Sequence, residues 1–305
     1  MTKGNLPLEL LNKHRMALGL ADSFVFENEN DLFVEHPAPI KNAIVFLPKS
    51  RALIDMTLAL ISGMVASDGM IALVGANNAG IGSAKKLYEA NIGSVDQKIV
   101  GNHSALYVGR NKRLGAEKKP QDFISYFSLI YKDTSIDVAN MPGVFSAGEL
   151  DEGTKLLLDT IPYDRTKVLD VGCGSGVIGA VYKKISPESD VTLCDKSLLA
   201  VMATQKTLEK NKVDAKVFAS DVFSDIAGTF DLIVTNPPFH KGVATDYTFI
   251  EKFSRDAKKY LAPGGVVYVV ANSFLSYAET LEKYIGPTET VVDNGKFKIF
   301  RSKAR

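Results

Sequence analysis

The sequence predicts an α/β protein made of two tandem domains, each built on a mostly parallel β-sheet. Its 305 residues suit two medium domains better than one. From Val168 onward, short β-branched runs alternate with longer amphipathic stretches, which is the pattern of βαβ units. The first half repeats this pattern more faintly, and the apolar periodicity breaks up near 133–141. We therefore expect domains at 1–140 and 141–305.

The second domain is expected to hold a seven-stranded sheet. Apolar runs predict its five parallel strands, at 167–171, 190–195, 215–219, 230–235 and 265–271. Amphipathic stretches predict the crossover helices, at 177–186, 197–211 and 247–261, and 150–158 has the pattern of a helix of mixed character. Two final runs, 289–292 and 296–300, flank Asp293-Asn294-Gly295, a strong hairpin signal. The sheet should therefore end in an antiparallel hairpin.

The first domain repeats these elements in weaker form. Its strands are expected at 43–47, 70–74, 97–101 and 104–108, and its helices at 50–66 and 79–90. The segment 70–80 can be laid over 168–176 so that Gly75 matches Gly172. The overlay fails at the ligand-facing positions, where Asp170, Gly174 and Gly176 meet Leu73, Asn77 and Ala79. We expect an old duplication whose first copy has lost its cofactor, with two domains of independent origin as the alternative.

Composition narrows the class of protein. With 46% hydrophobic and 23% charged residues, the chain is an ordinary globular protein and not a disordered one. Its first residues form no apolar signal core, and no apolar run is long enough to span a membrane, so we expect a cytoplasmic protein. Cys173 and Cys194 have no zinc-site spacing. We expect no metal, and two reduced cysteines that pack as small apolar residues.

Charge is unevenly distributed, although the net charge is only +1. Between 98 and 119 a single acid, Glu117, stands against six basic residues: Lys98, Arg110, Lys112, Arg113, Lys118 and Lys119. The last ten residues hold no acid and five basic residues: Lys296, Lys298, Arg301, Lys303 and Arg305. Such runs either hold RNA phosphates or form a solvated charged face. Both readings stay open on sequence alone.

A glycine-rich turn follows the first strand of the second domain. The strand ends in Asp170-Val171, and Gly172-x-Gly174-x-Gly176 comes next, at the sheet edge where open α/β sheets bind ligands. Missing Cβ atoms let a flat cofactor lie against the main chain. The same residues also fit the dinucleotide pattern G-x-G-x-x-G, which is weak when it stands alone. The turn predicts an adenosine-containing cofactor, and a tight turn without ligand is the alternative.

Two acidic residues follow the next two strands. Asp195 stands where a carboxylate accepts hydrogen bonds from ribose hydroxyls, about 20 residues beyond the turn. Asp221 stands where a carboxylate can accept the adenine amino group, or can simply cap the next turn. These positions fit both S-adenosylmethionine and a nicotinamide dinucleotide.

Asn236-Pro237-Pro238-Phe239 decides between these cofactors in favour of S-adenosylmethionine, because the motif suits methyl transfer to a planar nitrogen. A planar exocyclic amine is a poor nucleophile, so its site must hold both N–H groups and turn the lone pair toward the methyl group. The Asn236 side-chain oxygen and the Pro237 carbonyl can supply the two acceptors, and Phe239 can stack on the base. Orientation then carries catalysis, without a metal, a covalent intermediate or a general base. His240 and Lys241 meet a phosphate or face solvent, and a plain loop turn is the alternative.

The sequence closely resembles the ribosomal RNA small-subunit methyltransferase C family, whose members act on guanine N2 in 16S rRNA. Beyond the glycine-rich turn, the segments that carry the resemblance span most of the chain's second half: Pro142–Ser146, Leu150–Leu158, Leu193–Asp195, Val217–Ser224, Phe230–Gly242, Ala271–Leu275 and Gly295–Lys298. The loop after Gly242 does not match the family's pattern. Contacts to the base edge are therefore not assigned there.

The resemblance implies two tandem Rossmann-like methyltransferase domains, of which only the second binds S-adenosylmethionine. It implies 16S rRNA in the small subunit as partner, and we expect a monomer without membrane contact. The catalytic residues would be Asn236, Pro237, Pro238 and Phe239. The cofactor would meet Phe145, Ser146, Thr154, Asp170, Gly172, Cys173, Gly174, Gly176, Asp195, Lys196, Ser220, Asp221, Val222 and Asn236.

Three rival functions remain at this stage. A glutamine-amide protein methyltransferase also needs Asn-Pro-Pro, but usually has Tyr in the fourth place, and Phe239 with the basic runs favours RNA. An RNA-binding assembly factor without catalysis is disfavoured by the intact Gly172, Asp195 and Asn236. A nicotinamide-dependent oxidoreductase would explain only the glycine pattern.

Overall fold

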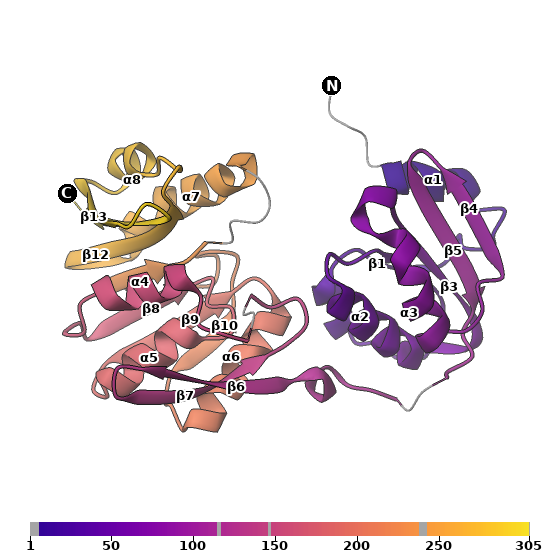
Figure 1. Cartoon of the computed structure of the whole chain (residues 1–305), viewed down its shortest axis with the longest axis horizontal. Helices are drawn as coiled ribbons and strands as arrows, with labels where there is room; N and C mark the ends of the chain where they lie inside the picture. The colour runs from indigo at the N-terminus through magenta and orange to yellow at the C-terminus, as the bar shows by residue number, and fades with distance from the viewer. Residues whose placement is uncertain (1–5, 115–116, 146–147, 238–242, 305) are drawn as a thin grey trace. The chain divides into compact units, whose positions relative to one another are not determined.

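The chain forms two compact units, Met1–Ile124 and Ser125–Arg305 (Figure 1). This computed structural model describes residues 6–114, 117–145, 148–237 and 243–304, without the side chains of 243–246. The division comes earlier than the expected boundary at about 140. The reason is a hairpin, β6 (Ser125–Tyr131) and β7 (Thr134–Asn140), that packs on helices of the second unit.

The second unit is built on a seven-stranded sheet of order β10-β9-β8-β11-β12-β14-β13. Five neighbouring strands are parallel, and β14 and β13 add the expected antiparallel hairpin at one edge. The strands are β8 (Lys167–Val171), β9 (Asp190–Asp195), β10 (Lys216–Ala219), β11 (Phe230–Thr235), β12 (Leu261–Asn272), β13 (Thr288–Asp293) and β14 (Phe297–Lys303). The sequence-predicted fold class is confirmed for this unit.

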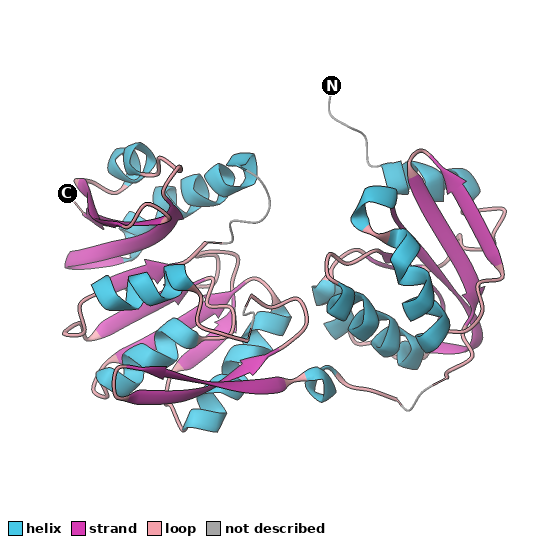
Figure 2. Ribbon diagram, in the orientation of Figure 1, coloured by secondary structure: helices cyan, strands magenta, loops and turns pink. Residues whose placement is uncertain are grey.

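Helices cover both faces of this sheet, as Figure 2 shows. They are α4 (Glu152–Thr160), α5 (Val177–Ile185), α6 (Leu198–Asn211), α7 (Val243–Ala257) and α8 (Ala278–Tyr284), with a 3-10 turn at Lys258–Tyr260. One face packs Val168 and Leu193 against α4 and α5. The other packs Leu169 and Val267 against α7 and α8. Burial on both faces explains why β8, β9, β11 and β12 read as near-continuous apolar runs.

The first unit has a five-stranded sheet of order β1-β2-β3-β5-β4, with β1 to β3 parallel and β5 and β4 antiparallel. Its strands are β1 (Phe24–Phe26), β2 (Ile40–Phe46), β3 (Val65–Ala76), β4 (Gln97–Gly101) and β5 (Ser104–Arg110). Its helices are α1 (Leu6–His14), α2 (Arg51–Met64) and α3 (Ile81–Asn91), with 3-10 turns at Glu29–Phe33, Asn77–Ala79 and Pro120–Phe123. Leu10 and Leu11 of α1 pack on one face of the sheet.

The sheet of the first unit corresponds to five neighbouring strands of the second sheet. The order β1-β2-β3-β5-β4 matches β8-β11-β12-β14-β13 in both neighbours and strand directions. Both carry the same bulge, because the pairings Ile40 with Val65 and Asn42 with Met70 repeat as Phe230 with Leu261 and Leu232 with Val266. This correspondence favours duplication over independent origin.

The bulge also corrects the expected overlay of 70–80 on 168–176. A Cβ on Gly69 would lie 2.3 Å from the Lys41 carbonyl oxygen, and one on Gly265 would lie 2.8 Å from that of Phe230. Glycine is required at both places for the same steric reason. The strand β3 is therefore the counterpart of β12, and the match of Gly75 with Gly172 was wrong.

None of the helices within the described ranges is long and apolar enough to cross a membrane.

Candidate active site

Most of the predicted cofactor residues gather at the carboxyl edge of β8, β9 and β10. The three strands are parallel neighbours, so their ends meet at one edge of the sheet. The glycine turn leaves β8 there and is tied to β9, because the N–H groups of Gly172 and Cys173 both donate to the Cys194 carbonyl, at 2.8 and 3.0 Å. The sequence-predicted constellation is thus brought together in space.

All three glycines of the turn have left-handed backbone, with φ of 74° at Gly172, 57° at Gly174 and 77° at Gly176. Non-glycine residues rarely adopt this conformation. A Cβ on Gly172 would meet no described atom within 4 Å, whereas one on Gly176 would lie 2.8 Å from Thr204 Cγ2. Gly172 therefore faces open space at the site, and Gly176 allows Thr204 of α6 to pack against the turn.

Asp170 is fully buried beneath the turn. One carboxylate oxygen, Oδ2, accepts the Gly179 N–H at 3.2 Å, while Oδ1 has no partner among the described residues. Burial raises the pKa of this carboxyl to about 7, although the hydrogen bond from Gly179 opposes the shift. An acceptor without a partner in the interior is costly, so this oxygen points to a missing donor.

Asp195 ends β9 and is bonded on both oxygens. Gly174 N–H donates to Oδ2 at 3.1 Å and Ser197 N–H donates to Oδ1 at 2.9 Å. Burial raises the pKa of Asp195, and these two backbone donors oppose the rise. The neighbouring Lys196 is exposed. A carboxylate held this rigidly presents its remaining lone pairs in a fixed direction.

The segment after β10 is held by its own hydrogen bonds. Ser220 donates its hydroxyl to the Val222 carbonyl at 3.2 Å and accepts from Asp225 N–H at 3.1 Å. Val222 is buried with φ of 63°, a strained backbone for a β-branched residue. Asp221 is exposed, and its carboxylate pairs with Lys252 of α7. Such an exposed pair is weak, so Asp221 stays accessible to a ligand.

Asn236 follows β11 and is held by the first turn of α4. Its Nδ2 donates to Asp151 Oδ2 at 3.1 Å and to Thr154 Oγ1 at 2.8 Å. Its Oδ1 is buried and has no partner among the described residues. The hydroxyl of the preceding Thr235 is also buried and has no described partner. Pro237 is buried beside them. The amide therefore offers one unused acceptor at the strand end.

The remaining predicted residues fall into four cases. The Phe145 carbonyl oxygen would lie 3.4 Å from a Cβ on Gly174, so this segment passes over the glycine turn. Cys173 is buried and its sulfur lies 3.3 Å from Thr204 Oγ1. Ser146, Pro238 and Phe239 lie outside the described residues. Thr154 reaches Asn236, and its predicted contact with the cofactor stays a prediction.

Sequence reasoning missed Asp151. It caps α4, since its carboxylate accepts the Thr154 N–H at 2.9 Å. The signal for a cap was present, because Asp before an apolar-periodic run is a preferred N-cap. No local pattern signals the contact with Asn236, because 85 positions separate the two residues.

Both cysteines are buried, and burial raises the pKa of each thiol, that of Cys194 to about 12. They are therefore protonated and unreactive at neutral pH. Within the described part of the chain, no group of three or more His, Cys, Asp or Glu side chains could hold a metal ion.

The basic runs are engaged in part, by ion pairs and by hydrogen bonds to backbone carbonyls. In the second unit, three acids form ion pairs with the C-terminal basic run: Glu152 with Lys296, Asp293 with Lys298 and Glu289 with Arg301. In the first unit Lys112 pairs with Asp68 at 2.7 Å, and Arg113 donates to the Val65 carbonyl at 3.0 Å. These contacts favour the solvated-face reading, although exposed pairs exchange readily with phosphate.

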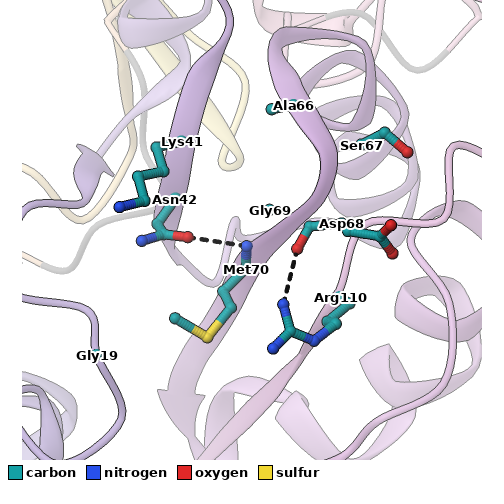
Figure 3. Close-up of a pocket in the computed structure, with 9 residues that line it drawn as sticks. All are labelled: Gly19, Lys41, Asn42, Ala66, Ser67, Asp68, Gly69, Met70 and Arg110. Carbon is teal, nitrogen blue, oxygen red and sulfur yellow. Dashed lines mark hydrogen bonds between the residues drawn. The ribbon is translucent and has the colours of Figure 1, made fainter.

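A pocket in the first unit lies away from the carboxyl ends of the parallel strands β2 and β3 (Figure 3). It opens at the bulge between β2 and β3, at the amino ends of these strands. Asn42 Oδ1 accepts the Met70 N–H at 3.0 Å, and Arg110 donates to the Asp68 carbonyl at 3.0 Å (Figure 3). Its polar groups thus stabilise the bulge, and it is not a counterpart of the glycine-turn edge.

Known families resemble both units. The family model for the methyltransferase small domain matches residues 135–301, and that for its N-terminal domain matches residues 12–127. A ribosomal RNA small subunit methyltransferase C from Aliivibrio salmonicida (strain LFI1238) is 36% identical, over 85% of this chain and 76% of the relative. One from Shewanella halifaxensis (strain HAW-EB4) is 33% identical, over 97% and 90%. This chain belongs to the methyltransferase C family.

A solved structure agrees with this family assignment. The T. thermophilus 16S rRNA N2 G1207 methyltransferase (RsmC), in complex with AdoMet and guanosine, matches with a TM-score of 0.78 and 27% identity, over 90% of this chain and 75% of that one. Members of the methyltransferase C family have the two-domain arrangement predicted from the sequence. The oxidoreductase reading of the glycine pattern is wrong.

Proposed function

We propose that this chain transfers a methyl group from S-adenosylmethionine to the exocyclic N2 of a guanine in 16S rRNA of the small ribosomal subunit. The observation that carries the proposal is the unused, buried Oδ1 of Asn236 at the end of β11. That strand neighbours β8, which carries the glycine turn. The similarity to relatives named ribosomal RNA small subunit methyltransferase C, and to a structure containing AdoMet and guanosine, supports the same activity.

The residues present fit S-adenosylmethionine. Its ammonium, ribose hydroxyls and adenine amine are donors, and the edge offers Asp170 Oδ1, Asp195 and Asp221 as acceptors. The open space at Gly172 lets a flat ligand approach the main chain. We assign the cofactor to the predicted set, with Phe145 above the turn.

When bound, the cofactor supplies an electrophilic methyl group on a sulfonium. The chain's part is orientation. Asn236 Oδ1 and the Pro237 carbonyl accept the two N–H groups of the guanine amine, so its lone pair is turned toward the methyl carbon. The lone pair forms the new N–C bond, the S–C bond breaks, and its electrons return to sulfur. The amine becomes cationic and then loses a proton to water, so no general base is needed.

The first unit is proposed to bind no cofactor. Its described sheet has no counterpart of β9 and β10, the strands that precede Asp195 and Asp221. The position of Asn236 is taken by Phe46, because Val45 pairs with Leu73 as Thr235 pairs with Val269. The unit therefore lacks both acidic strand ends and the amide acceptor. We propose that it serves stability and placement of the RNA.

The test is incubation of the chain with methyl-labelled S-adenosylmethionine and undermethylated small subunits, followed by nucleoside analysis. We expect label in N2-methylguanosine. Label in protein glutamine would support the rival protein methyltransferase, and binding to subunits without transfer would support an assembly factor. Either result would overturn the proposal. The partner and the cytoplasmic location follow from this function and are proposed with it, and the monomeric state is proposed separately.

The Asn236→Ala variant tests the mechanism in the same assay. It removes the acceptor Oδ1 at the strand end. We expect turnover to fall by about a hundred-fold or more, with the affinity for S-adenosylmethionine, measured by calorimetry, within about three-fold of wild type. Turnover of this variant at the wild-type rate would contradict the mechanism.

A further inference from the structure

The contacts of Asn236 show how its amide is oriented. Both amide hydrogens are used, one on Asp151 Oδ2 and one on Thr154 Oγ1. The Thr154 hydroxyl donates in turn to Asp151 Oδ2 at 3.3 Å, and the Thr154 N–H donates to the same oxygen at 2.9 Å. One carboxylate oxygen is thus the common acceptor of the cluster.

A flipped amide would be unfavourable here. It would place Asn236 Oδ1 against Asp151 Oδ2, where two acceptors repel, and would leave the NH2 group facing the substrate. Thr154 alone does not choose between the two orientations, because a hydroxyl both donates and accepts. Asp151 is therefore the group that decides which atom of Asn236 faces the site.

We propose that Asp151 is a positioning residue for methyl transfer, acting through Thr154 and Asn236. This inference rests on the proposed function. The carboxylate holds Asn236 Oδ1 toward the guanine amine and polarises the amide, since hydrogen-bonded groups in series strengthen one another. Its negative charge also favours the positive charge that develops on the amine nitrogen. Asp151 does not act as a general base in this proposal.

A capping role alone must be separated from this one. Asp151 caps α4, and Ser is an equally good N-cap. The Asp151→Ser variant therefore keeps the cap and removes the carboxylate. Glu152→Gln is the matched control, because it removes one negative charge from the same helical turn, where Glu152 pairs with the exposed Lys296 and with no other described cation.

The first measurement is the single-turnover rate of methyl transfer with saturating cofactor. We expect Asp151→Ser to lower this rate by about ten- to a hundred-fold, with an unchanged dissociation constant for S-adenosylmethionine and an unchanged unfolding midpoint. Glu152→Gln should keep the wild-type rate. A wild-type rate for Asp151→Ser would overturn the proposal.

Exchanging the two side chains gives a sharper measurement. Asn236→Asp should be nearly inactive, because it sets two carboxylates against each other. Adding Asp151→Asn removes one of the two facing carboxylates and leaves an oxygen facing the amine. We expect the double variant to be at least about ten-fold faster than Asn236→Asp. No recovery would contradict the positioning role.

A readout without substrate separates this inference from the proposed function. The side-chain amide signal of Asn236, identified by NMR through its loss in Asn236→Asp, should be protected from hydrogen exchange in wild type. Protection should disappear in Asp151→Ser and in Thr154→Val and persist in Glu152→Gln. If small subunits accept no methyl group, the function fails while this result still decides the positioning. An unprotected wild-type amide would refute it.

Discussion

At the scale of single residues, the site is a set of polar atoms without described partners around a turn that contains three glycines. Asp170 Oδ1 and Asn236 Oδ1 are both buried and unbonded within the described chain, and both are acceptors. Leaving each acceptor without a partner costs on the order of 1–3 kcal/mol. These positions therefore lower stability in return for ligand binding, as functional sites commonly do.

Asp170 makes stability depend on pH. Its pKa in the folded chain is about 7 against an ordinary value of 3.8. The pKa is raised on folding, so the contribution of Asp170 to the free energy of unfolding is highest below about pH 4 and falls as pH rises toward 7, by up to about 1.4 kcal/mol per pH unit. The Asp170→Asn variant lacks this fall. We expect urea unfolding to show the variant gaining on wild type between about pH 5 and pH 7.

The contrary result for Asp170 would be a difference between the two proteins that stays constant over this pH range. It would show that the carboxyl titrates at the same pH in the folded and unfolded chains.

Substituting Gly172 tests whether the turn contacts the cofactor, provided that the effect of backbone strain on stability is measured separately. Gly172→Ala forces alanine to φ of 74° and places a methyl group in the space proposed for the cofactor. Gly228→Ala is the control, with φ of 83° and no described atom within 4 Å of the added Cβ. We expect each to cost about 1–2 kcal/mol of stability, while only Gly172→Ala weakens S-adenosylmethionine binding, by about ten-fold or more. Equal affinities in calorimetry would remove the turn from the cofactor site.

At the scale of elements, the hairpin β6–β7 is the part that ties the boundary region to the catalytic unit. Asn211, the last residue of α6, donates to the Asp137 carbonyl at 2.7 Å and accepts the Asp137 N–H at 2.9 Å. Thr207 accepts the Ala139 N–H at 3.0 Å. The strand β7 is therefore held by helix α6, and the hairpin is not part of the seven-stranded sheet.

The Asn211→Ala variant should show how strong this attachment is. It leaves the N–H and carbonyl of Asp137 without partners, so we expect a loss of about 1–3 kcal/mol in the free energy of unfolding, measured with urea. Lys206→Ala on the same helix removes only an exposed pair with Glu209 and should leave that energy nearly unchanged. Equal effects of the two substitutions would show that the hairpin is not held by Asn211.

Local patterns predicted the elements that are buried on both faces, β8, β9 and β11, to within a residue or two. The strand β12 begins at Leu261 and not at 265, because the chain enters the sheet through a bulge before Gly265. The hairpin β6–β7 was missed, since its turn at Lys132 has left-handed backbone without a glycine or asparagine to signal it. The glycine turn is a local feature and was predictable, whereas the contact of Asp151 with Asn236 arises only from folding.

At the scale of the whole molecule, the two units have separate cores, and the division at Ile124 has a direct test. A fragment of residues 125–305 keeps Ile136 and Val138, which are fully buried against α5 and α6. A fragment of residues 141–305 loses them and exposes that core. We expect calorimetry to show one cooperative unfolding transition for the longer fragment, and the shorter one to aggregate or melt well below it. Equal melting of both would return the boundary to about 140.

From the five shared strands we infer how many molecules of cofactor one chain takes up. The sheet of the first unit stops at β1, where the second continues to β9 and β10. Substituting Phe46 or restoring single glycines supplies no strand end, so point changes within residues 1–124 cannot open a second site. Titration with S-adenosylmethionine should therefore reach its equivalence point at about one mole per mole of chain, and a saturated chain can complete only one transfer before product leaves.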